Sequence, residues 1–147
     1  VIMHELILPN DTNNLNTVFG GKVMQYMDLC AAMSAYKFAR TAVVTASVDR
    51  LDFLAPARVG DMLILKSSVN YNHNSSMEVG VRIDAENVKT GKRRHTASAY
   101  LTFVSLDDNG KPQKVNNIIP KSDNEKRRYK EGKIRHAQRL ERLKSRK

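Results

Sequence analysis

The sequence of 147 residues predicts one α+β domain in which an antiparallel sheet curls around a single helix near the start of the chain. Three observations predict this class. A stretch with helical character, from Gly20 to about Phe38, is apolar nearly all round, and such a helix is normally buried. Residues 43–104 contain four segments with strand patterning and little else. The length allows one domain with a real core and is too short for two ordinary ones.

The first part of the chain leads into the helix. Residues 2–8 are apolar enough for a short first strand. A polar run of Pro, Asp and Asn from Pro9 to Thr17 predicts a loop. The helix then begins at a glycine pair, Gly20-Gly21, and apolar side chains recur on almost every side of it. The segments that follow are therefore expected to wrap it.

The four strands differ in how regularly apolar and polar residues alternate along them. In the first strand the alternation of apolar residues changes phase at Asp49–Arg50, and this change predicts a bulge or a bend. The third, residues 77–86, alternates apolar and polar residues throughout and predicts a half-buried strand. The other two are expected near residues 62–71 and 97–104. Turns and links are predicted at 55–61, Asn72–Ser75, Lys89–Lys92 and Asp107–Gly110.

The composition changes after Pro120, which divides the chain into a domain over residues 1–120 and a basic tail over residues 121–147. The net charge is +10 for the whole chain, and the tail alone holds 12 Lys and Arg against 4 Asp and Glu. Ser122 and Glu125 have the spacing of a capping box, so the tail is expected to be helical. Its thin apolar stripe and single aromatic residue favour a solvated, partly mobile extension that binds no nucleic acid. Attraction of an anionic ligand, an RNA or a membrane surface is the alternative.

Cysteine usage and hydropathy indicate the compartment. The single cysteine, Cys30, excludes an internal disulfide and fits a reducing compartment, and its place in the apolar helix favours a buried structural thiol. No segment approaches the ~20 apolar residues needed to span a bilayer, and the first residues lack the basic region of a signal peptide. We therefore expect a cytoplasmic protein with no membrane insertion.

A candidate site lies where the loop becomes the helix. A helix that opens with Gly20 and Gly21 offers free N–H groups and a positive dipole end, which can hold an oxygen that gains negative charge. Asp28 is the only carboxylate in the otherwise uncharged run from Val23 to Tyr36. The alternative is structural, with glycines that allow close packing and an acid that caps a backbone group.

The spacing of these two features constrains how they work together. Asp28 lies eight residues beyond Gly20, so it is roughly 12 Å further along the helix axis at a rise of about 1.5 Å per residue. One reacting carbonyl cannot touch both groups of the same helix. If both serve one site, the acid must come from a second copy of the chain in a dimer.

The Asp11-Thr12-Asn13 loop leaves two interpretations open. Its side chains suit turns that shape the entry to the helix. The amide of Asn13 could equally lie beside the glycine N–H groups. A carboxylate and an amide that converge on a polarised carbonyl would suit acyl hydrolysis.

Other chemistries have little support. The four histidines are scattered without metal-ligand spacing, and the chain has neither a G-x-S-x-G elbow nor a phosphate-binding G-x-x-x-x-G-K-[ST] loop. Ser75-Ser76 beside His73 are expected to shape a turn, although a turn hydroxyl can also meet a phosphate. No metal ion and no separate cofactor are expected.

Seven motifs occur along the chain in this order: Pro9-x-Asp11-Thr12-Asn13, Phe19-Gly20-Gly21-Lys22-Val23-Met24, Met27-Asp28, Val44-Thr45-Ala46-Ser47-Val48-Asp49, Val59-Gly60-Asp61, Ser75-Ser76-Met77-Glu78-Val79 and Phe103-Val104. Together they resemble the bacterial acyl-CoA thioesterases of the hotdog fold. The resemblance covers about Leu6 to Pro120 and is specific to the subgroup that includes the YciA-type hydrolases and the brain acyl-CoA hydrolase.

This resemblance implies a curled antiparallel sheet around a long central helix, and hydrolysis of acyl-CoA to CoA and a carboxylic acid. Asp28 would be the general base or nucleophile, the N–H of Gly21 would polarise the thioester carbonyl, and Asn13 would come from the other subunit. Homodimers that associate further, as a trimer of dimers forming a hexamer, are implied as well. Coenzyme A is part of the substrate and product rather than a cofactor. The expected substrate-binding residues are Gly20, Thr12, Phe19, Ser75 and Ser76.

Two positions depart from the family pattern. Many relatives have Gly at the position of Asn16, and Asn tolerates a positive φ better than most residues. Many also have Arg at the position of Asn74, so a CoA phosphate contact expected there lacks its usual partner.

Two rival functions stay open. A non-catalytic acyl-CoA sensor on the same fold would bind its ligand stoichiometrically without releasing thiol. An RNA-binding protein acting through residues 121–147 would lose its function when the tail is deleted, whereas a thioesterase would keep its turnover.

Overall fold

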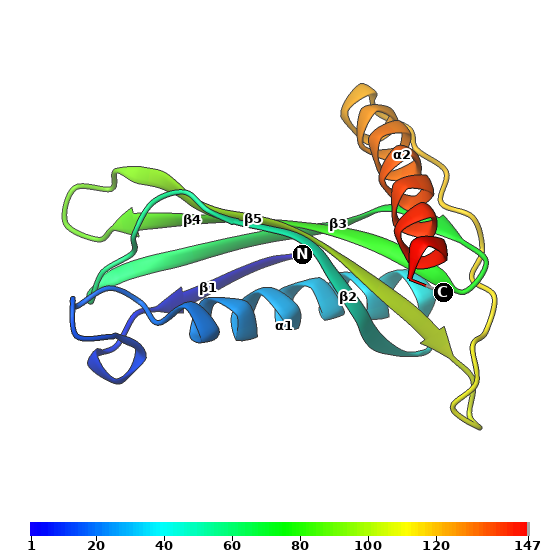
Figure 1. Ribbon diagram of the computed structural model, residues 1–147. Helices are drawn as coiled ribbons and strands as arrows, with labels where there is room; N and C mark the ends of the chain where they lie inside the picture. The colour runs from blue at the N-terminus through cyan, green and yellow to red at the C-terminus, as the bar shows by residue number, and fades with distance from the viewer. Residues whose placement is uncertain (147) are drawn as a thin grey trace.

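A computed structural model of the chain describes residues 1–146, and its elements follow the order expected from the sequence (Figure 1). One long helix lies early in the chain, four long strands follow it, and a second long helix ends the chain. The elements are β1 (Ile2–Leu6), the single 3-10 turn η1 (Pro9–Asp11), α1 (Gly20–Ala39), β2 (Ala42–Phe53), β3 (Asp61–His73), β4 (Ser76–Asn87), β5 (Arg93–Leu106) and α2 (Asp123–Ser145).

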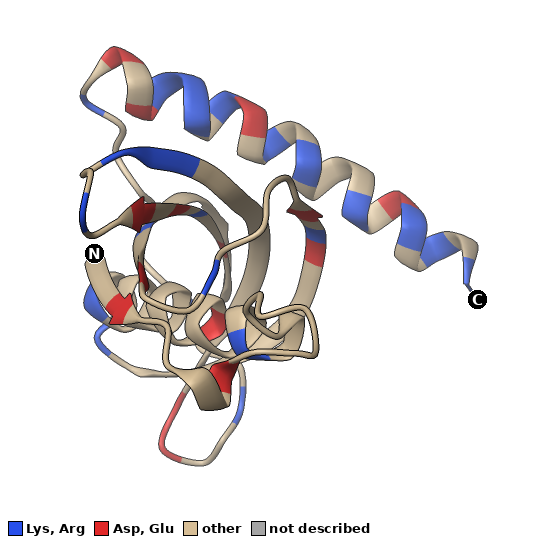
Figure 2. Ribbon diagram, turned by 90° about the vertical axis from the view of Figure 1, so that its left-hand side faces the viewer, with Lys and Arg blue, Asp and Glu red and all other residues tan. Residues whose placement is uncertain are grey.

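The five strands form one antiparallel sheet in the order β1-β3-β4-β5-β2. β3, β4 and β5 make up its centre and are joined by short turns, while β1 and β2 form its two edges. The sheet curls over α1, and α2 lies outside the curl (Figures 1 and 2). This is the hotdog arrangement, so the predicted α+β class is confirmed.

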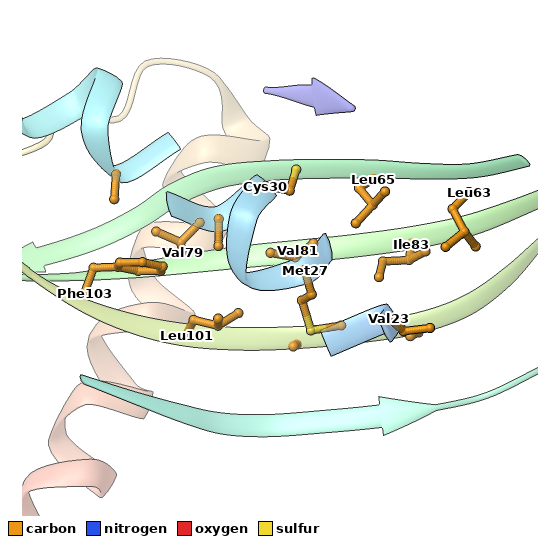
Figure 3. Packing of buried hydrophobic residues seen from close by; sticks show 14 of the residues in the cluster. Val23, Met27, Cys30, Leu63, Leu65, Val79, Val81, Ile83, Leu101 and Phe103 are labelled. Atoms are coloured by element: carbon orange, nitrogen blue, oxygen red, sulfur yellow. The ribbon is translucent and has the colours of Figure 1, made fainter. Parts of the chain in front are cut away.

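One face of α1 fills the inside of the curl. Val23, Met27, Cys30, Ala31 and Ala35 recur at helical spacing and are all buried. They meet the inward side chains of β3, β4 and β5, which alternate along each strand (Figure 3). Burial of each large apolar side chain contributes about 1.5–3 kcal/mol, so this contact is the main stabilising interaction of the domain.

The opposite face of α1 is not covered by the chain itself. Met24, Leu29 and Tyr36 are 44, 51 and 48% exposed, and the neighbouring strand β2 exposes Val44 and Val48. The expectation of a helix buried on every side is therefore wrong for a single chain, because the sheet curls over only one side of the helix. An apolar face beside an edge strand is typical of a surface for association.

β2 carries two irregularities. Its pairing with β5 shifts register between Thr45 and Ser47, and again between Val48 and Arg50. The second shift confirms the bulge predicted at Asp49–Arg50, and the first was not expected. Asp49 turns to the outer side of the sheet, where its carboxylate accepts a hydrogen bond from Thr102 Oγ1 at 2.9 Å.

The basic tail forms the helix that its capping sequence predicts. The hydroxyl of Ser122 accepts a hydrogen bond from the Glu125 N–H at 3.1 Å, which is half of a capping box. One side of α2 packs against the sheet, closest at Gly132, where a Cβ would lie 2.9 Å from the Cβ of Tyr71. The tail is therefore only partly solvated, because a glycine in this position allows a helix to approach a strand closely.

Charged contacts hold α2 on the outer face of the sheet. Arg135 donates two hydrogen bonds to the carboxylate of Glu78, at 2.9 and 2.7 Å, and its guanidinium lies 3.7 Å from the ring centroid of Tyr100. Desolvation lowers the pKa of Arg135, but its hydrogen bonds and its attraction to Glu78 outweigh that effect and raise it overall. Further along the helix, Arg139 and Arg142 lie 3.8 and 3.4 Å from Asp49.

The docking of α2 is expected to weaken in acid through His136. Burial lowers the pKa of this imidazole, and the nearby His73 and Arg139 lower it further, although Glu78 acts in the opposite direction. Its Nε2 is buried and has no hydrogen-bond partner within residues 1–146. A histidine whose pKa is lower in the folded state binds fewer protons when folded, so stability is present at neutral pH and falls as pH drops below its usual 6.5.

Thermal unfolding measured between pH 7.5 and 5 tests this expectation. The wild type should lose thermal stability over this range by more than the His136→Gln variant, because the variant has no imidazole to protonate. Equal pH dependence in the two proteins would contradict it.

Candidate active site

The N-terminus of α1 presents two free amide groups. α1 follows Phe19, whose backbone is extended and whose side chain makes no cap hydrogen bond. The first hydrogen bonds into the helix are donated by Lys22 and Val23, both to the Phe19 carbonyl, at 2.9 and 3.2 Å. Within residues 1–146 the N–H groups of Gly20 and Gly21 have no acceptor, as expected for the first turn of an uncapped helix. These are the donors that an oxyanion requires.

The glycine end of α1 borders a hollow of about 360 Å³. Gly20 contributes to it from α1, Thr17 from the preceding loop, and Phe53 from the end of β2. Phe19 is 59% exposed, and its ring lies against Gly21, where a Cβ would come within 2.9 Å of the ring. Gly20 and Phe19 are therefore both at this end of the helix, as expected from the sequence.

The loop before α1 is shaped by Asn13. Its Oδ1 accepts hydrogen bonds from the Leu15 N–H at 2.9 Å and from the Thr17 hydroxyl at 3.1 Å. The hydroxyl of Thr12 donates to the Pro9 carbonyl at 2.7 Å. The turn-forming interpretation is therefore confirmed for both side chains, and the Nδ2 group of Asn13 remains available as a donor.

Asn16 adopts the backbone conformation that glycine would favour. Its φ is 58°, in the left-handed region. Asparagine reaches this region at lower cost than most residues, so the chain keeps this turn without a glycine. The departure at this position does not change the loop.

Asp28 lies near the middle of α1, where the helix runs beside β2; we call the line along which these two elements meet the seam. Its side chain is exposed in the single chain, and its Oδ1 accepts a hydrogen bond from the hydroxyl of Thr45 at 2.6 Å. Both residues line a hollow of about 230 Å³ that is otherwise apolar, with Met24, Met27, Val48, Leu51 and Leu101 as its remaining walls. A fixed carboxylate beside apolar walls suits chemistry on an acyl group.

Thr45 is the site residue that sequence analysis missed. It lies within a motif of β2, where a threonine is an ordinary β-former and carries no signal of a site. Its contact with Asp28 joins residues 17 positions apart, on β2 and α1. Only the packing of β2 against α1 reveals this pair.

The glycine end and the acid end remain separate within one chain. The hollow at Gly20 and the hollow at Asp28 have no lining residue in common, and both open along the seam between α1 and β2. This agrees with the separation expected from helical rise. One chain therefore holds two half-sites.

Ser75 and Ser76 lie away from these half-sites, Ser75 in the turn after β3 and Ser76 at the first position of β4. Ser76 Oγ donates to the His73 carbonyl at 3.0 Å, and Asn74 has a φ of 51°. Ser76 precedes Met77, which is buried inside the curl, so alternation puts Ser76 on the outer face. The turn-forming interpretation holds for Ser76, and within one chain neither serine is brought to Asp28.

Residues 1–146 contain neither of two common features, a metal site and a membrane-spanning helix. No group of three or more His, Cys, Asp or Glu side chains in residues 1–146 is arranged to hold a metal ion. Over the same residues, neither helix combines the length and the hydropathy of a membrane span.

A curled sheet around one helix, with free glycine N–H groups and a lone carboxylate at the helix–strand seam, defines a hotdog-fold protein suited to acyl chemistry. The model of the thioesterase superfamily matches residues 15–92. The uncharacterized acyl-CoA thioester hydrolase YkhA of Bacillus subtilis is 45% identical over 125 residues, which are 85% of this chain and 73% of that protein. This chain belongs to the thioesterase superfamily.

Other relatives extend the comparison. The cytosolic acyl coenzyme A thioester hydrolase of Mus musculus is 38% identical over 90% of this chain, but the chain spans only 35% of that protein's length. An apo-hexameric acyl-CoA thioesterase matches with a TM-score of 0.93 and 45% identity over 97% of this chain and 92% of that one. An acyl-CoA hydrolase of Staphylococcus aureus, solved with butyryl-CoA, CoA and CoA disulfide, matches with a TM-score of 0.87 and 41% identity over 99% and 91%. Variants of that hydrolase have been solved in which an aspartate, an asparagine or a threonine is replaced by alanine.

Proposed function

We propose that this chain is an acyl-CoA thioesterase that releases coenzyme A and a carboxylic acid at sites shared between two subunits. The observation that carries the proposal is the pair of half-sites in the seam, with free glycine N–H groups at the N-terminus of α1 and Asp28 held by Thr45 further along the helix. The names of the B. subtilis and mouse relatives and the butyryl-CoA complex of the S. aureus hydrolase support this substrate class.

The residue assignment is supported by spacing. The asparagine, aspartate and threonine altered in the S. aureus hydrolase lie 15 and 17 residues apart along its chain. Asn13, Asp28 and Thr45 have the same spacing here. We therefore assign these three residues to the reaction.

The proposed chemistry follows from the groups that meet when two subunits face each other. The N–H of Gly21 in one subunit stabilises the oxyanion that forms when the thioester carbonyl is attacked. Asp28 of the other subunit either takes a proton from the attacking water or attacks directly, forming an anhydride that water then hydrolyses. The C–S bond breaks, and a proton goes to the sulfur of coenzyme A. The Nδ2 group of Asn13 orients the water or the carbonyl, because its oxygen is engaged in the loop.

We propose a dimer formed over the seam, with dimers joining as a trimer of dimers. Exposed apolar side chains on α1 and β2 support the dimer, since a second copy would cover them. A hexameric relative with a TM-score of 0.93 supports the larger assembly.

Thr45 is expected to position Asp28. Replacing it with valine keeps the shape and removes the hydroxyl that donates to the carboxylate, so one charge-assisted hydrogen bond is lost. We expect kcat to fall about 10- to 100-fold with little change in KM, because such a bond contributes roughly 1.5–3 kcal/mol. Thr45→Ser should restore most of the activity. Equal activity in Thr45→Val and the wild type would contradict this role.

A thiol-release assay over a panel of acyl-CoA substrates, from acetyl to palmitoyl, tests the function. Turnover with at least one substrate, at a stoichiometry of one free thiol per thioester consumed, is the expected result. A protein that binds acyl-CoA stoichiometrically without releasing thiol would be a sensor, and the proposal would then fail. Removing residues 121–147 should leave measurable turnover, whereas an RNA-binding protein acting through its tail would lose its function.

Cys30 should not interfere with such an assay. Its side chain is fully buried, its Sγ lies 3.4 Å from Ser67 Oγ, and burial raises the pKa of the thiol. The thiolate is the reactive form, so we expect no reaction with a thiol reagent in the native protein and full reaction in denaturant. Rapid labelling of Cys30 in the native protein would contradict this packing.

We further propose that the enzyme acts in the cytoplasm. The name of the mouse relative supports this, as does a free buried thiol, which suits a reducing compartment. Cell fractionation with activity as the readout would test it.

A further inference from the structure

A cavity lies between the first half of α2 and the outer face of the sheet. Its volume is about 420 Å³, and it is separate from both hollows in the seam. α2 approaches the sheet most closely at Gly132 and is held there by the Arg135–Glu78 pair. Toward its N-terminus the helix rises away from the strands (Figure 1). We call the resulting cavity the α2 wedge; Arg127 and Arg128 line it from the helix.

The floor of the α2 wedge lies across the sheet from Asp28. Gly80 and Arg82 of β4 line the wedge, while Val79 and Ile83, which alternate with them along the strand, are buried in the core inside the curl. Successive residues of a strand point to opposite faces, so the wedge and α1 lie on opposite sides of the sheet. A ligand in the wedge cannot reach the Asp28 hollow of the same chain.

The α2 wedge has an excess of positive charge. Five cationic side chains line it, and Glu131 is the one acid among its described lining residues (Lys66, Arg82, Arg127, Arg128 and Arg135 are the cations). Figure 2 shows the same basic character along α2 as it crosses the sheet.

Two of these cations have no counter-ion. Arg135 is paired with Glu78, Arg82 lies 3.2 Å from Asp84, and Arg127 lies 3.9 Å from Glu131. Lys66 and Arg128 have no carboxylate within 4.0 Å anywhere in residues 1–146. They lie on β3 and α2, on opposite walls of the wedge. Like charges facing each other across a cavity repel, and a bound anion removes that repulsion.

The remaining walls offer neutral donors. Tyr100 brings a hydroxyl group to the floor, and Asn70 brings an amide with one N–H to spare, since its Nδ2 donates the other to Glu78 at 3.2 Å. The hydroxyls of Ser68 and Ser98 also lie there and pair with Asn70 Oδ1 and His95 Nε2. A volume of about 420 Å³ is within the range of small-molecule sites and exceeds what a single inorganic phosphate would fill. Arginine and lysine with hydroxyl donors are the groups that bind phosphate oxygens.

We propose that the α2 wedge binds a phosphorylated small molecule that carries two or more negative charges, such as the diphosphate of a nucleotide. The chemistry has two sources: a free phosphorylated metabolite, or the diphosphate of a coenzyme A molecule held by a neighbouring chain. In either case Lys66 and Arg128 close on the anion from β3 and α2, and the ligand ties the helix to the sheet.

An anion bound in the α2 wedge also affects the seam between α1 and β2, because α2 contacts β2. Further along the same helix, Arg139 Nε donates to Ser47 Oγ at 3.3 Å, and Arg142 donates to Asp49 Oδ1 at 3.4 Å. Ser47 and Asp49 both belong to the irregular part of β2. Ser47 lies between Thr45 and Val48, and Asp49 directly follows Val48. An anion that fixes α2 therefore also stabilises the strand that positions Thr45.

Isothermal titration with inorganic pyrophosphate and with ADP tests the proposal on the full chain. The Lys66→Gln/Arg128→Gln double variant removes the two unpaired cations. The Lys130→Gln/Lys133→Gln double variant is the matched control, since it removes two charges from exposed positions on the same helix that do not line the wedge. We expect both probes to bind the wild type and the control, to raise their melting temperatures, and to bind the Lys66→Gln/Arg128→Gln variant at least about tenfold more weakly.

Equal affinities of the two double variants would overturn the proposal, as would the absence of binding of both probes to the wild type at millimolar concentration. Saturating coenzyme A distinguishes the sources. If pyrophosphate still binds, the ligand is a free metabolite; if coenzyme A displaces pyrophosphate from the wild type and binds the Lys66→Gln/Arg128→Gln variant more weakly than the control, the wedge takes the diphosphate of coenzyme A. Both results depend on binding alone, so they stand whether or not thiol release is observed.

Discussion

Replacing Asp28 with asparagine is expected to lower kcat for acyl-CoA hydrolysis by about 10²–10⁴-fold, the usual contribution of a general base or nucleophile. Asparagine has the same shape, but it carries no charge and cannot take a proton from water or attack a carbonyl. KM should change little, because the seam hollows that would bind the acyl group keep their walls.

The fold should survive this substitution. Asp28 is exposed in the single chain, and the one side-chain hydrogen bond that it makes within residues 1–146 comes from a threonine hydroxyl that can also pair with an amide oxygen. The melting temperature and the oligomeric state should therefore match those of the wild type. Asp108→Asn, the same change at an exposed position in the turn after β5, is the matched control and should keep full activity. An Asp28→Asn enzyme that retains more than about a tenth of wild-type turnover would remove Asp28 from the reaction.

Much of the fold could be predicted from the sequence because its signals are local. The helix from Gly20 is confirmed almost to the residue, since a glycine pair opens it and Arg40, with a φ of 56°, ends it. The bulge near Asp49–Arg50 was visible as a change of phase, because alternation with a period of two reports directly on strand register.

The packing of α2 could not be predicted in the same way. Its apolar stripe is thin, and its contacts with the sheet are made by arginines, a glycine and a histidine, which also occur on solvated helices. Glu78 alternates with core residues on β4, so its position in the sequence predicts an exposed acid. In the structure it is buried under the helix. Only the docking of α2 on the outer face of the sheet brings Arg135 to Glu78.

Only part of the candidate site could be predicted, because only some of its residues depart from the local sequence pattern. Gly20, Gly21 and Asp28 stood out because they interrupt the pattern of an apolar helix. Thr45 conforms to the pattern of its strand and gave no signal of its own. Its role became apparent from its hydrogen bond to Asp28.

The second large effect is expected when two inactive variants are combined in one dimer. Asn13→Ala removes the amide that shapes the glycine end, and Asp28→Asn removes the acid, so each variant alone should be inactive. In a mixed dimer, one of the two shared sites receives both changes and the other receives neither. The intact site combines the normal glycine end of one subunit with the normal acid of the other.

Co-expression of the two variants with different affinity tags, followed by purification on both tags, gives such mixed assemblies. Purification on both tags selects hexamers that contain both variants, and random pairing in equal amounts makes about half of the dimers within them mixed, each with one intact site, so activity should reach about a quarter of the wild-type value. The control is Asp28→Asn co-expressed under both tags, which should stay inactive.

This mixed-dimer measurement tests the shared site most directly. Recovery to about a quarter of wild-type turnover, from two parents that are each inactive, is the result that we predict. A mixture no more active than its parents would show that the glycine end and Asp28 do not complete one site across two subunits.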